Sequence, residues 1–366
     1  MLNHKTVAVV VPAYNEETQI GMVIETMPDF VDRIIIVNDC SKDKTAEVVM
    51  QYISNDATEK KAFYNKLNKE FERNRYNHAE EVLHQLNKDE LKLFTPSEVS
   101  NTHAETDRII LINHKKNGGV GGAIASGYKW CKDHDIDCTA VMAGDGQMDP
   151  HELEGICLPV INDGVDYVKG NRLIHRSAWL VIPRLRFFGN SILSIMTKLA
   201  SGYWKVSDTQ TGYTAISNAA LNAIRLHDIY KSYGMPNDML VKLNIAMCSL
   251  REVPIKPVYK VGEQSKMKVS KVIPKVSWLL LKLFIKRLWI KYLFRDFHPL
   301  FLLYNFAFLL MLIDIPVGIK IIHQFLTGQS ITFQALTVFV FLTISAFQSI
   351  LFAMWMDIQD NERLYK

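Results

Sequence analysis

Short apolar runs alternate with amphipathic segments along the first 260 residues of the chain. Residues 6–11 and 33–37 are continuous runs rich in β-branched side chains, typical of strands that are buried on both faces. Each run is followed by apolar residues at helical spacing, first at residues 20–27 and then from about Thr45. This order predicts an α/β fold with a mostly parallel sheet and right-handed crossovers.

The same alternation continues farther along the chain, with one interruption. Further strands are expected at residues 108–112, 140–142, 166–169, 214–216 and 251–259. Residues 52–107 break the rhythm, because they are rich in Lys, Glu, Asn and His and carry apolar residues only at helical spacing. We interpret this segment as a helical insertion on the surface of the domain.

Two long apolar runs dominate the last quarter of the chain. Residues 301–322 and 331–356 are each long enough to cross the hydrocarbon core of a bilayer. Asp314 lies inside the first run, and the sequence leaves open whether it has a function or faces the neighbouring helix. Residues 273–297 alternate bulky apolar residues with lysine and arginine, which suits helices that lie in the membrane interface.

The distribution of basic residues predicts how these helices are oriented. The loop at residues 323–330 has no lysine or arginine, whereas the segment before the spans has many, so both termini are expected in the cytoplasm. Residues 7–11 are too short for a signal-peptide core and end at Pro12. We expect a multi-pass protein of the cytoplasmic membrane with three parts: a cytosolic domain (1–262), basic interfacial helices (263–298), and two transmembrane helices with a short cytoplasmic tail (299–366).

Net charge and cysteine content exclude two other classes of protein. A net charge of +4 over 366 residues is too small to indicate a nucleic-acid partner. The five cysteines form neither a CxxC pair nor a zinc-type spacing, so we expect reduced thiols that bind no metal.

Candidate chemistry concentrates at residues 139–150, TAVMAGDGQMDP. A short buried strand there runs into a turn that carries Asp145, Gln147 and Asp149. Closely spaced oxygen ligands at the carboxyl edge of a sheet are how an α/β fold builds a site for a cation and a phosphate. Taken alone the signal is modest, because Asp-Gly is also an ordinary turn dipeptide.

A glycine-rich segment at residues 117–122 precedes a predicted helix that begins near Ala123. Glycines at a helix N-terminus suit phosphate, because free N–H groups and the helix dipole both favour an anion. The segment is neither a dinucleotide fingerprint nor a Walker loop, since Ile124 takes the place of the last glycine and no lysine-serine pair follows.

Taken together, the motifs resemble the family-2 inverting glycosyltransferases of the GT-A fold, and most closely the polyprenyl-phosphate hexose synthases. The matching pieces, in chain order, are Pro12-Ala13-Tyr14-Asn15-Glu16, Val37-Asn38-Asp39-Cys40-Ser41, Asn117 with its glycines, Gly144-Asp145-Gly146-Gln147-Met148-Asp149-Pro150, Gly170-Asn171-Arg172, Asp208-Thr209-Gln210-Thr211-Gly212 and Gly262-Glu263-Gln264-Ser265-Lys266. The resemblance covers about residues 5 to 270 without the insertion.

The resemblance implies a role for each matching position. A nucleotide sugar, UDP- or GDP-linked with a lean to UDP, would be the donor, and a polyprenyl phosphate such as undecaprenyl phosphate would be the acceptor. The residues implied for the donor are Pro12, Tyr14, Glu16, Asp39, Asn117 and Gly118, with Asp145 and Gln147 at a Mg²⁺ or Mn²⁺ ion. The other implied catalytic residues are Arg172 and Arg186, which would grip phosphate, and Asp208 and Asp238.

One departure from the family pattern affects the metal site. The family often has Asp-x-Asp where this chain has Ala143-Gly144-Asp145, so the first carboxylate is missing. Asp149 or water would complete the coordination, since Mg²⁺ tolerates few protein ligands. The departure also leaves open a membrane protein that binds nucleotide sugar without catalysis.

The chemistry of the acceptor separates the two enzymatic alternatives. A lipid phosphate is already anionic at neutral pH, whereas a lipid or glycan hydroxyl requires a general base. Asp238 lies roughly where hydroxyl-using relatives place their base, and a capping role for it is slightly favoured. The two apolar runs at residues 301–322 and 331–356 favour a lipid phosphate as the acceptor, because they would hold the protein at a membrane. The sequence leaves homo-oligomer formation open.

Overall fold

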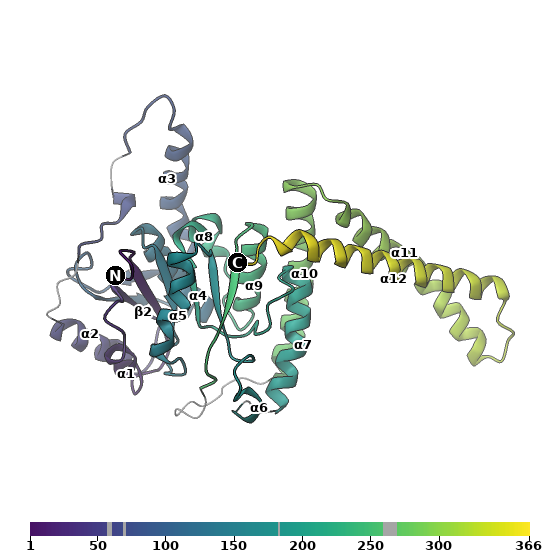
Figure 1. Cartoon of the computed structure of the whole chain (residues 1–366), viewed down its shortest axis with the longest axis horizontal. Coiled ribbons are helices and arrows are strands. Elements are labelled where there is room, and N and C mark those ends of the chain that lie inside the picture. Colours follow the sequence, from purple (N-terminus) through teal and green to yellow (C-terminus); the bar gives the residue numbers. More distant parts are fainter. Residues whose placement is uncertain (57–60, 69–70, 182–183, 259–268) are drawn as a thin grey trace.

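The computed structural model describes residues 1–56, 61–68, 71–181, 184–258 and 269–366, and an eight-stranded sheet forms its centre (Figure 1). The strands are β1 (Val7–Ala13), β2 (Arg33–Asn38), β3 (Ser97–Val99), β4 (Ile109–His114), β5 (Cys138–Val141), β6 (Tyr167–Asn171), β7 (Thr214–Ser217) and β8 (Leu250–Pro254). Their order across the sheet is β3-β4-β2-β1-β5-β7-β6-β8. The predicted α/β fold is confirmed.

Helices cover both faces of this sheet. They are α1 (Ile20–Glu25), α2 (Thr45–Asn55), α4 (Val120–Asp133), α5 (Leu153–Asn162), α8 (Asn218–Ala223) and α9 (Met235–Ile245), with 3₁₀ turns η3 (Pro150–Glu152) and η4 (Leu226–Asp228). Successive residues of a strand point to opposite faces. Val9 of β1 therefore packs in one core with α1, α2 and α5, and Val10 packs in the other with α4, α8 and α9.

The sheet is mixed but mostly parallel, as predicted, and β3 and β7 run against its other strands. β1 is parallel to β2 and β5, β2 to β4, and β6 to β8. β7 runs antiparallel to both β5 and β6, and β3 runs antiparallel to β4. Apolar runs alone do not encode direction. β8 also ends at Pro254, five residues before the predicted end, at a residue that has no N–H to donate.

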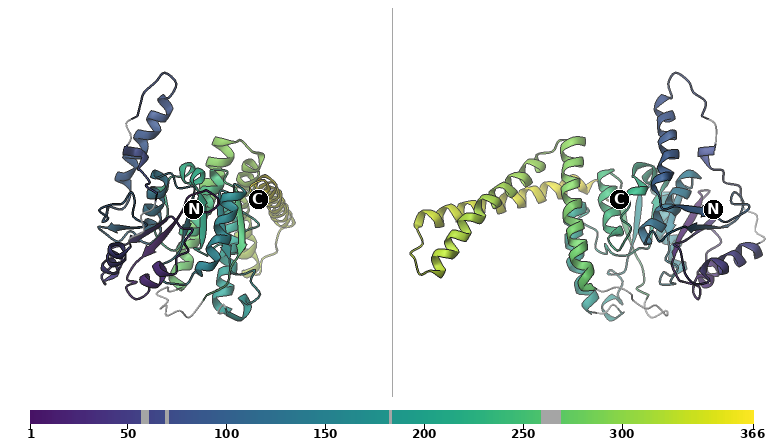
Figure 2. Two further views of the ribbon diagram at one scale, coloured as in Figure 1. Left: turned by 60° about the vertical axis from the view of Figure 1, so that its left-hand side comes forward. Right: turned by 180° about the vertical axis from the view of Figure 1, so that it is seen from behind.

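The insertion is only partly helical. It contains the 3₁₀ turns η1 (Lys66–Asn68) and η2 (Leu91–Leu93) and helix α3 (His78–Glu90), which projects from the domain in Figures 1 and 2. It also contains β3, a three-residue exposed edge strand that is too short to show a hydrophobic period. Glu90 anchors the base of α3 through ion pairs with His227 at 2.8 Å and Lys132 at 3.5 Å.

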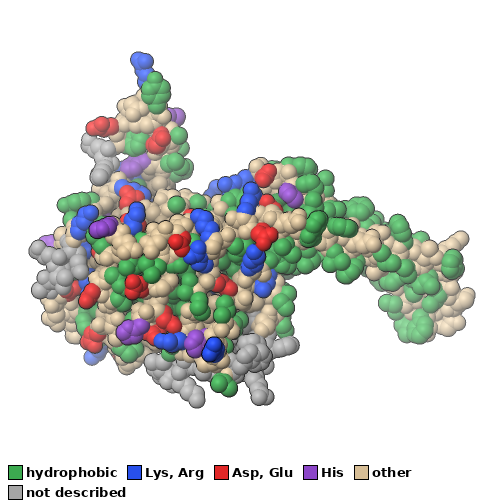
Figure 3. Space-filling model, viewed as in Figure 1, with side chains coloured by type: hydrophobic (Ala, Val, Ile, Leu, Met, Phe, Trp, Pro, Cys, Tyr) green, Lys and Arg blue, Asp and Glu red, His purple; other side chains and the backbone are tan. Residues whose placement is uncertain are grey.

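Helices that follow β6 and β8 along the chain form a separate layer beside the domain and a hairpin that extends from it (Figure 2). They are α6 (Ala178–Val181), α7 (Arg184–Ser201), α10 (Val269–Trp289), the π-helical turn η5 (Ile290–Arg295), α11 (Pro299–Leu326) and α12 (Phe333–Glu362). α7 and α10 pack side by side. α11 and α12 are long and apolar enough to cross a membrane. In Figure 3 the hairpin surface is mostly hydrophobic, whereas acidic and basic side chains gather on the domain.

The two apolar helices face each other through one polar contact. Thr343 Oγ1 of α12 donates a 2.7 Å hydrogen bond to Asp314 Oδ2 of α11. Asp314, left open by the sequence, therefore faces the neighbouring helix.

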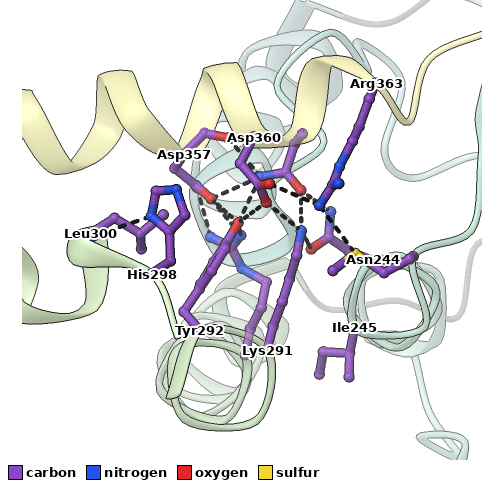
Figure 4. A network of polar contacts seen from close by, with 12 residues as sticks. Asn244, Ile245, Lys291, Tyr292, His298, Leu300, Asp357, Asp360 and Arg363 are labelled. Atoms are coloured by element: carbon purple, nitrogen blue, oxygen red, sulfur yellow. Dashed lines mark hydrogen bonds and ion pairs between the residues drawn. The ribbon is translucent and has the colours of Figure 1, made fainter. Parts of the chain in front are cut away.

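A buried polar network joins the base of the hairpin to the domain (Figure 4). Asp357 of α12 accepts hydrogen bonds from Arg287 Nη1 at 2.7 Å and Nη2 at 2.8 Å, and both side chains are fully buried. Lys291 Nζ donates to Asn361 Oδ1 at 2.6 Å and pairs with Asp360 at 3.1 Å. Buried charges are tolerated when they are paired in this way.

The C-terminal residues return to the sheet. Leu250 N of β8 donates to Leu364 O at 2.7 Å, and Tyr365 forms a parallel bridge with Leu250. Leu364 belongs to the core that α4 and α9 share. The last residues are thus packed onto the sheet domain, and both ends of the hairpin start from that domain.

Candidate functional site

A cavity of about 170 Å³ lies where the loops after β5, β6 and β8 meet. The residues that line it are Ala143, Asp145, Gln147, Met148, Asp149, Glu152, Arg172, Thr211, Gly212, Tyr213, Ile255, Lys256 and Val258. Asp145, Gln147 and Arg172, which the sequence predicts as site residues, are therefore brought together. Glu152 and Lys256 are additions that the sequence analysis missed.

The turn after β5 presents its oxygen atoms to this cavity. Asp145 Oδ1 accepts from the Gln147 backbone N–H at 3.1 Å, across Gly146, whose φ of +70° suits glycine. Asp149 Oδ1 accepts from His151 N at 3.0 Å and caps the 3₁₀ turn η3, while its Oδ2 lies 3.5 Å from Lys256 Nζ. The turn is therefore held by its own carboxylates.

The turn after β5 offers few protein ligands for a divalent cation. Among the described residues no group of three or more His, Cys, Asp or Glu side chains could hold a metal ion. Asp145 and Gln147 supply hard oxygen ligands, and Mg²⁺ commonly binds one or two carboxylates together with substrate phosphates and water. The donor set therefore suits an ion that arrives with a diphosphate rather than a resident ion in a protein cage.

Arg172 is fixed by Asp208. Its Nε and Nη2 donate to Asp208 Oδ2 at 2.8 Å and Oδ1 at 3.0 Å, a bidentate pair, and its backbone N donates to Oδ2 at 3.2 Å. Burial acts to raise the pKa of Asp208, but the guanidinium charge and its hydrogen bonds lower it below the usual value. Asp208 is almost fully buried and does not line the cavity, so it acts on the site through Arg172.

Asp39 forms a second cluster with Asn117 and Gly118. Asp39 Oδ1 accepts from Gly118 N at 2.6 Å and lies 2.7 Å from His114 Nδ1, and Asn117 Nδ2 donates to the Asp39 carbonyl at 3.3 Å. Burial acts to raise the pKa of this carboxyl, yet the hydrogen bonds from His114 and Gly118 lower it. His114, at the end of β4, is a residue that the sequence analysis missed, since only pairing with a residue 75 positions away reveals its role.

The glycines at the start of α4 serve close packing. A Cβ at Gly119 would lie 2.2 Å from the Lys231 carbonyl oxygen, and one at Gly121 would lie 2.0 Å from that of Tyr230. Gly121 N donates to Lys231 O, and Gly119 N donates to Asn117 Oδ1. These two N–H groups are thus bonded to protein acceptors, and phosphate binding by the segment stays a prediction.

The remaining predicted residues lie outside the cavity lining. Pro12 is half-buried near the end of β1, and the backbone N of Glu16 donates to Thr45 Oγ1, which places the Pro12–Glu16 segment beside α2. Tyr14 is partly exposed there. Asp238 is buried and accepts from Tyr230 N at 2.8 Å and from Lys242 Nζ.

Two predictions cannot be placed. The Arg186 side chain, in α7, and residues 262–266 lie outside the described residues.

The lowered pKa of Asp39 predicts a pH-dependent contribution to stability. A carboxyl whose pKa is lower in the folded state stabilises the fold above its unfolded pKa of about 3.9 and loses this contribution as the pH falls. We expect Asp39→Asn to lower the thermal midpoint at pH 6.5 and to match the wild type more closely at pH 3.5. Asp29→Asn, at an exposed carboxylate, is the control. A deficit of equal size at both pH values would contradict this account.

Comparison with known proteins extends these observations. Residues 8–82 and 93–225 match the family described as glycosyl transferase family 2. The chain is 28% identical over 256 residues to a UDP-N-acetylglucosamine--dolichyl-phosphate N-acetylglucosaminyltransferase of Methanococcus voltae, which covers 70% of this chain and 86% of the relative. It is 27% identical over 165 residues to an undecaprenyl-phosphate mannosyltransferase of Micrococcus luteus, covering 45% and 67%.

A solved structure of glucosyl-3-phosphoglycerate synthase from Mycobacterium tuberculosis, in complex with Mn²⁺, UDP and glucosyl-3-phosphoglycerate, is also similar. It superposes with a TM-score of 0.46 at 14% identity, over 78% of this chain and 80% of that one.

Proposed function

Because the chain belongs to glycosyl transferase family 2, we propose that it transfers a hexose from a nucleotide sugar to a polyprenyl phosphate, with inversion at the anomeric carbon. The observation that carries the proposal is the cavity itself, where Asp145 and Gln147 face Arg172 in a chain that ends in an apolar hairpin. The two relatives named above, whose names specify dolichyl phosphate and undecaprenyl phosphate, support this class of acceptor.

The proposed reaction needs little proton transfer. An oxygen of the acceptor phosphate attacks the anomeric carbon, the bond from that carbon to the diphosphate oxygen breaks, and the electron pair leaves with the nucleoside diphosphate. A bound divalent cation would neutralise the charge of the leaving diphosphate, with Asp145 and Gln147 as its protein ligands. Arg172, oriented by Asp208, supplies positive charge for a phosphate in the same cavity.

The nucleotide would lie along the same carboxyl edge of the sheet, beside the ends of β1, β2 and β4 and away from the Arg172 side of the cavity. Asp39, Asn117 and Gly118 form one cluster after β2 and β4, and the Pro12–Glu16 segment continues β1 beside them. We propose that these residues, with Tyr14 and Glu16, bind the base and ribose. A UDP-linked donor is favoured over a GDP-linked one by the name of the Methanococcus relative.

The acceptor class can be tested directly. Purified protein in detergent, with Mg²⁺ or Mn²⁺, undecaprenyl phosphate and a panel of nucleotide sugars, should release a nucleoside diphosphate and form a lipid-linked sugar that hydrolyses in mild acid. Nucleotide-sugar binding without a product across the panel would instead favour a hydroxyl acceptor or a non-catalytic binding protein.

Asp238→Asn separates the phosphate acceptor from the hydroxyl acceptor. We expect the variant to keep most of its turnover, because a phosphate needs no base and Asp238 is occupied by Tyr230 N and Lys242. The thermal midpoint is measured alongside, since Lys242 loses its ion-pair partner. Loss of turnover by more than about 100-fold at an unchanged midpoint would favour the hydroxyl acceptor.

We further propose that α11 and α12 span the cytoplasmic membrane and that α7 and α10 lie at its cytoplasmic surface. α10 exposes Trp278, Leu281 and Ile285 beside the exposed Lys282 and Lys286, a composition suited to an anionic interface. Because Leu364 and Tyr365 pack on β8, both ends of the hairpin would lie on the side of the domain.

Cysteine labelling tests this topology. In a Cys40→Ser background, which removes the exposed native cysteine, we expect Gln329→Cys in the hairpin loop to react with an impermeant maleimide in intact cells. Tyr76→Cys, on the exposed surface of the insertion, should react only after lysis. The reverse pattern, or no labelling of Gln329→Cys before lysis, would contradict the orientation.

A further inference from the structure

Lys169 of β6 is a fully buried lysine directly behind the candidate site. None of its surface is exposed, and its ammonium group donates to the carbonyl oxygen of Thr211. An ammonium group without water is costly unless charge and hydrogen bonds compensate it. The mechanism outlined above does not use this lysine, so its burial needs another explanation.

Two carboxylates supply the compensation: Asp208, which is buried, and Glu252, which is half-buried. Asp208 and Glu252 both act electrostatically on Lys169, and Glu252 faces it across the parallel β6–β8 pair. Glu252 accepts from Ser207 N at 3.0 Å, Asp208 N at 3.1 Å and Asn171 Nδ2 at 2.7 Å. Burial lowers the pKa of Lys169 to about 8, although both carboxylates act to raise it. With Arg172, which lines the cavity, the cluster holds two cations and two anions.

Lys169 reaches the site through the turn at residues 208–212. At one end of this turn Asp208 holds Arg172 in a bidentate pair, and at the other end Thr211 and Gly212 line the cavity. Lys169 binds the Thr211 carbonyl directly and attracts Asp208 by charge. One side chain therefore fixes both ends of the turn from below.

We propose that Lys169 is a positioning residue that holds the 208–212 turn and the Asp208 carboxylate so that Arg172 is aimed at a phosphate group in the cavity. The proposal depends on the proposed function in one respect, which is that the phosphate ligand is taken to be a prenyl phosphate. Lys169 itself touches no reacting atom, since its side chain is fully buried and does not line the cavity.

The test compares Lys169→Met with Lys129→Met. Lys129 is also a buried lysine, paired with Asp133 at 2.7 Å on α4, away from the cavity lining, so it controls for the general cost of removing a buried charge. Binding of geranyl phosphate in the presence of nucleoside diphosphate and Mg²⁺, kcat and KM with undecaprenyl phosphate, and the thermal midpoint are measured for both variants.

We expect Lys169→Met to weaken prenyl-phosphate binding and to lower kcat/KM for that acceptor by about 10- to 100-fold, as loss of supporting contacts does at other sites. Affinity for the nucleoside diphosphate should stay within about threefold of wild type, because Asp39 and its neighbours are untouched. Lys129→Met should lower the midpoint and leave acceptor binding unchanged. Lys169→Arg, which keeps the charge and the donor, should recover part of the loss.

The proposal would be overturned if a folded Lys169→Met protein bound geranyl phosphate as tightly as the wild type does. It would also be overturned if Lys129→Met lost as much affinity for geranyl phosphate as Lys169→Met. If the Lys169 variants do not fold, Asp208→Asn replaces them, and unchanged prenyl-phosphate binding in that variant overturns the proposal. Geranyl phosphate binding is read without turnover. If the wild type binds geranyl phosphate but transfers no sugar to a lipid phosphate, the proposed function is rejected. The binding measurements on the Lys169 variants still decide whether Lys169 is a positioning residue.

Discussion

We expect Asp145→Ala to lower the turnover number by about 10²- to 10³-fold, the cost of removing one group that stabilises developing charge. Asp145 is a carboxylate on the turn after β5 that lines the cavity together with Arg172. With Ala143 in place of the first family carboxylate, no other side chain of that motif can replace it. Turnover is followed as nucleoside diphosphate release over a titration of Mg²⁺ and Mn²⁺, with and without EDTA.

Two variants of the same turn control this measurement. Asp149→Ala removes a carboxylate that caps η3 and contacts Lys256, so we expect a smaller loss of turnover and a lower thermal midpoint. Ala143→Asp restores the missing carboxylate and should lower the Mg²⁺ concentration at half-maximal rate. Turnover that survives Asp145→Ala, or that EDTA leaves unchanged, would show that the metal assignment is wrong. An inactive wild type that still binds nucleotide sugar would favour the non-catalytic alternative.

The second large effect concerns the joint between the hairpin and the domain. We expect Arg287→Met to lower the free energy of unfolding by about 3–5 kcal/mol, because it leaves a buried carboxylate without its cation. Arg287 and Asp357 are both fully buried, and Arg287 also donates to the carbonyl oxygens of Leu199 and Ala200 on α7. The measurement is denaturant unfolding of the full chain in detergent.

A double variant separates the charge from the packing. Arg287→Met with Asp357→Asn removes both charges, so we expect it to lose less stability than the two single variants added together. Lys205→Met is the control, because its ion pair with Glu362 is exposed and should contribute little to stability. Strict additivity of the two buried substitutions would contradict an ion pair that holds the hairpin to α7 and α10.

Features that depend on short stretches of chain can be predicted from the amino-acid sequence. The β-branched run at residues 7–11 has apolar side chains on both faces of the strand. It therefore predicts a strand covered on both sides, whichever elements cover it, and the run is buried in the structure. The length of the apolar runs likewise determined two spanning-length helices. Asp145 and Gln147 lie two residues apart on one turn, so their joint position needed no tertiary information.

Contacts between residues that are far apart in the sequence become visible only in the folded chain. The family resemblance implies a catalytic role for Asp208, yet its side chain is buried and holds Arg172 from 36 positions away. The sequence shows that Gly119 and Gly121 suit a helix N-terminus, but only the fold brings the carbonyl groups of Lys231 and Tyr230 against them. The direction of β7 and the return of Tyr365 to β8 were equally hidden. The physical reason is that hydrophobic periodicity reports burial and length, whereas the partner of a buried polar group depends on the path of the whole chain.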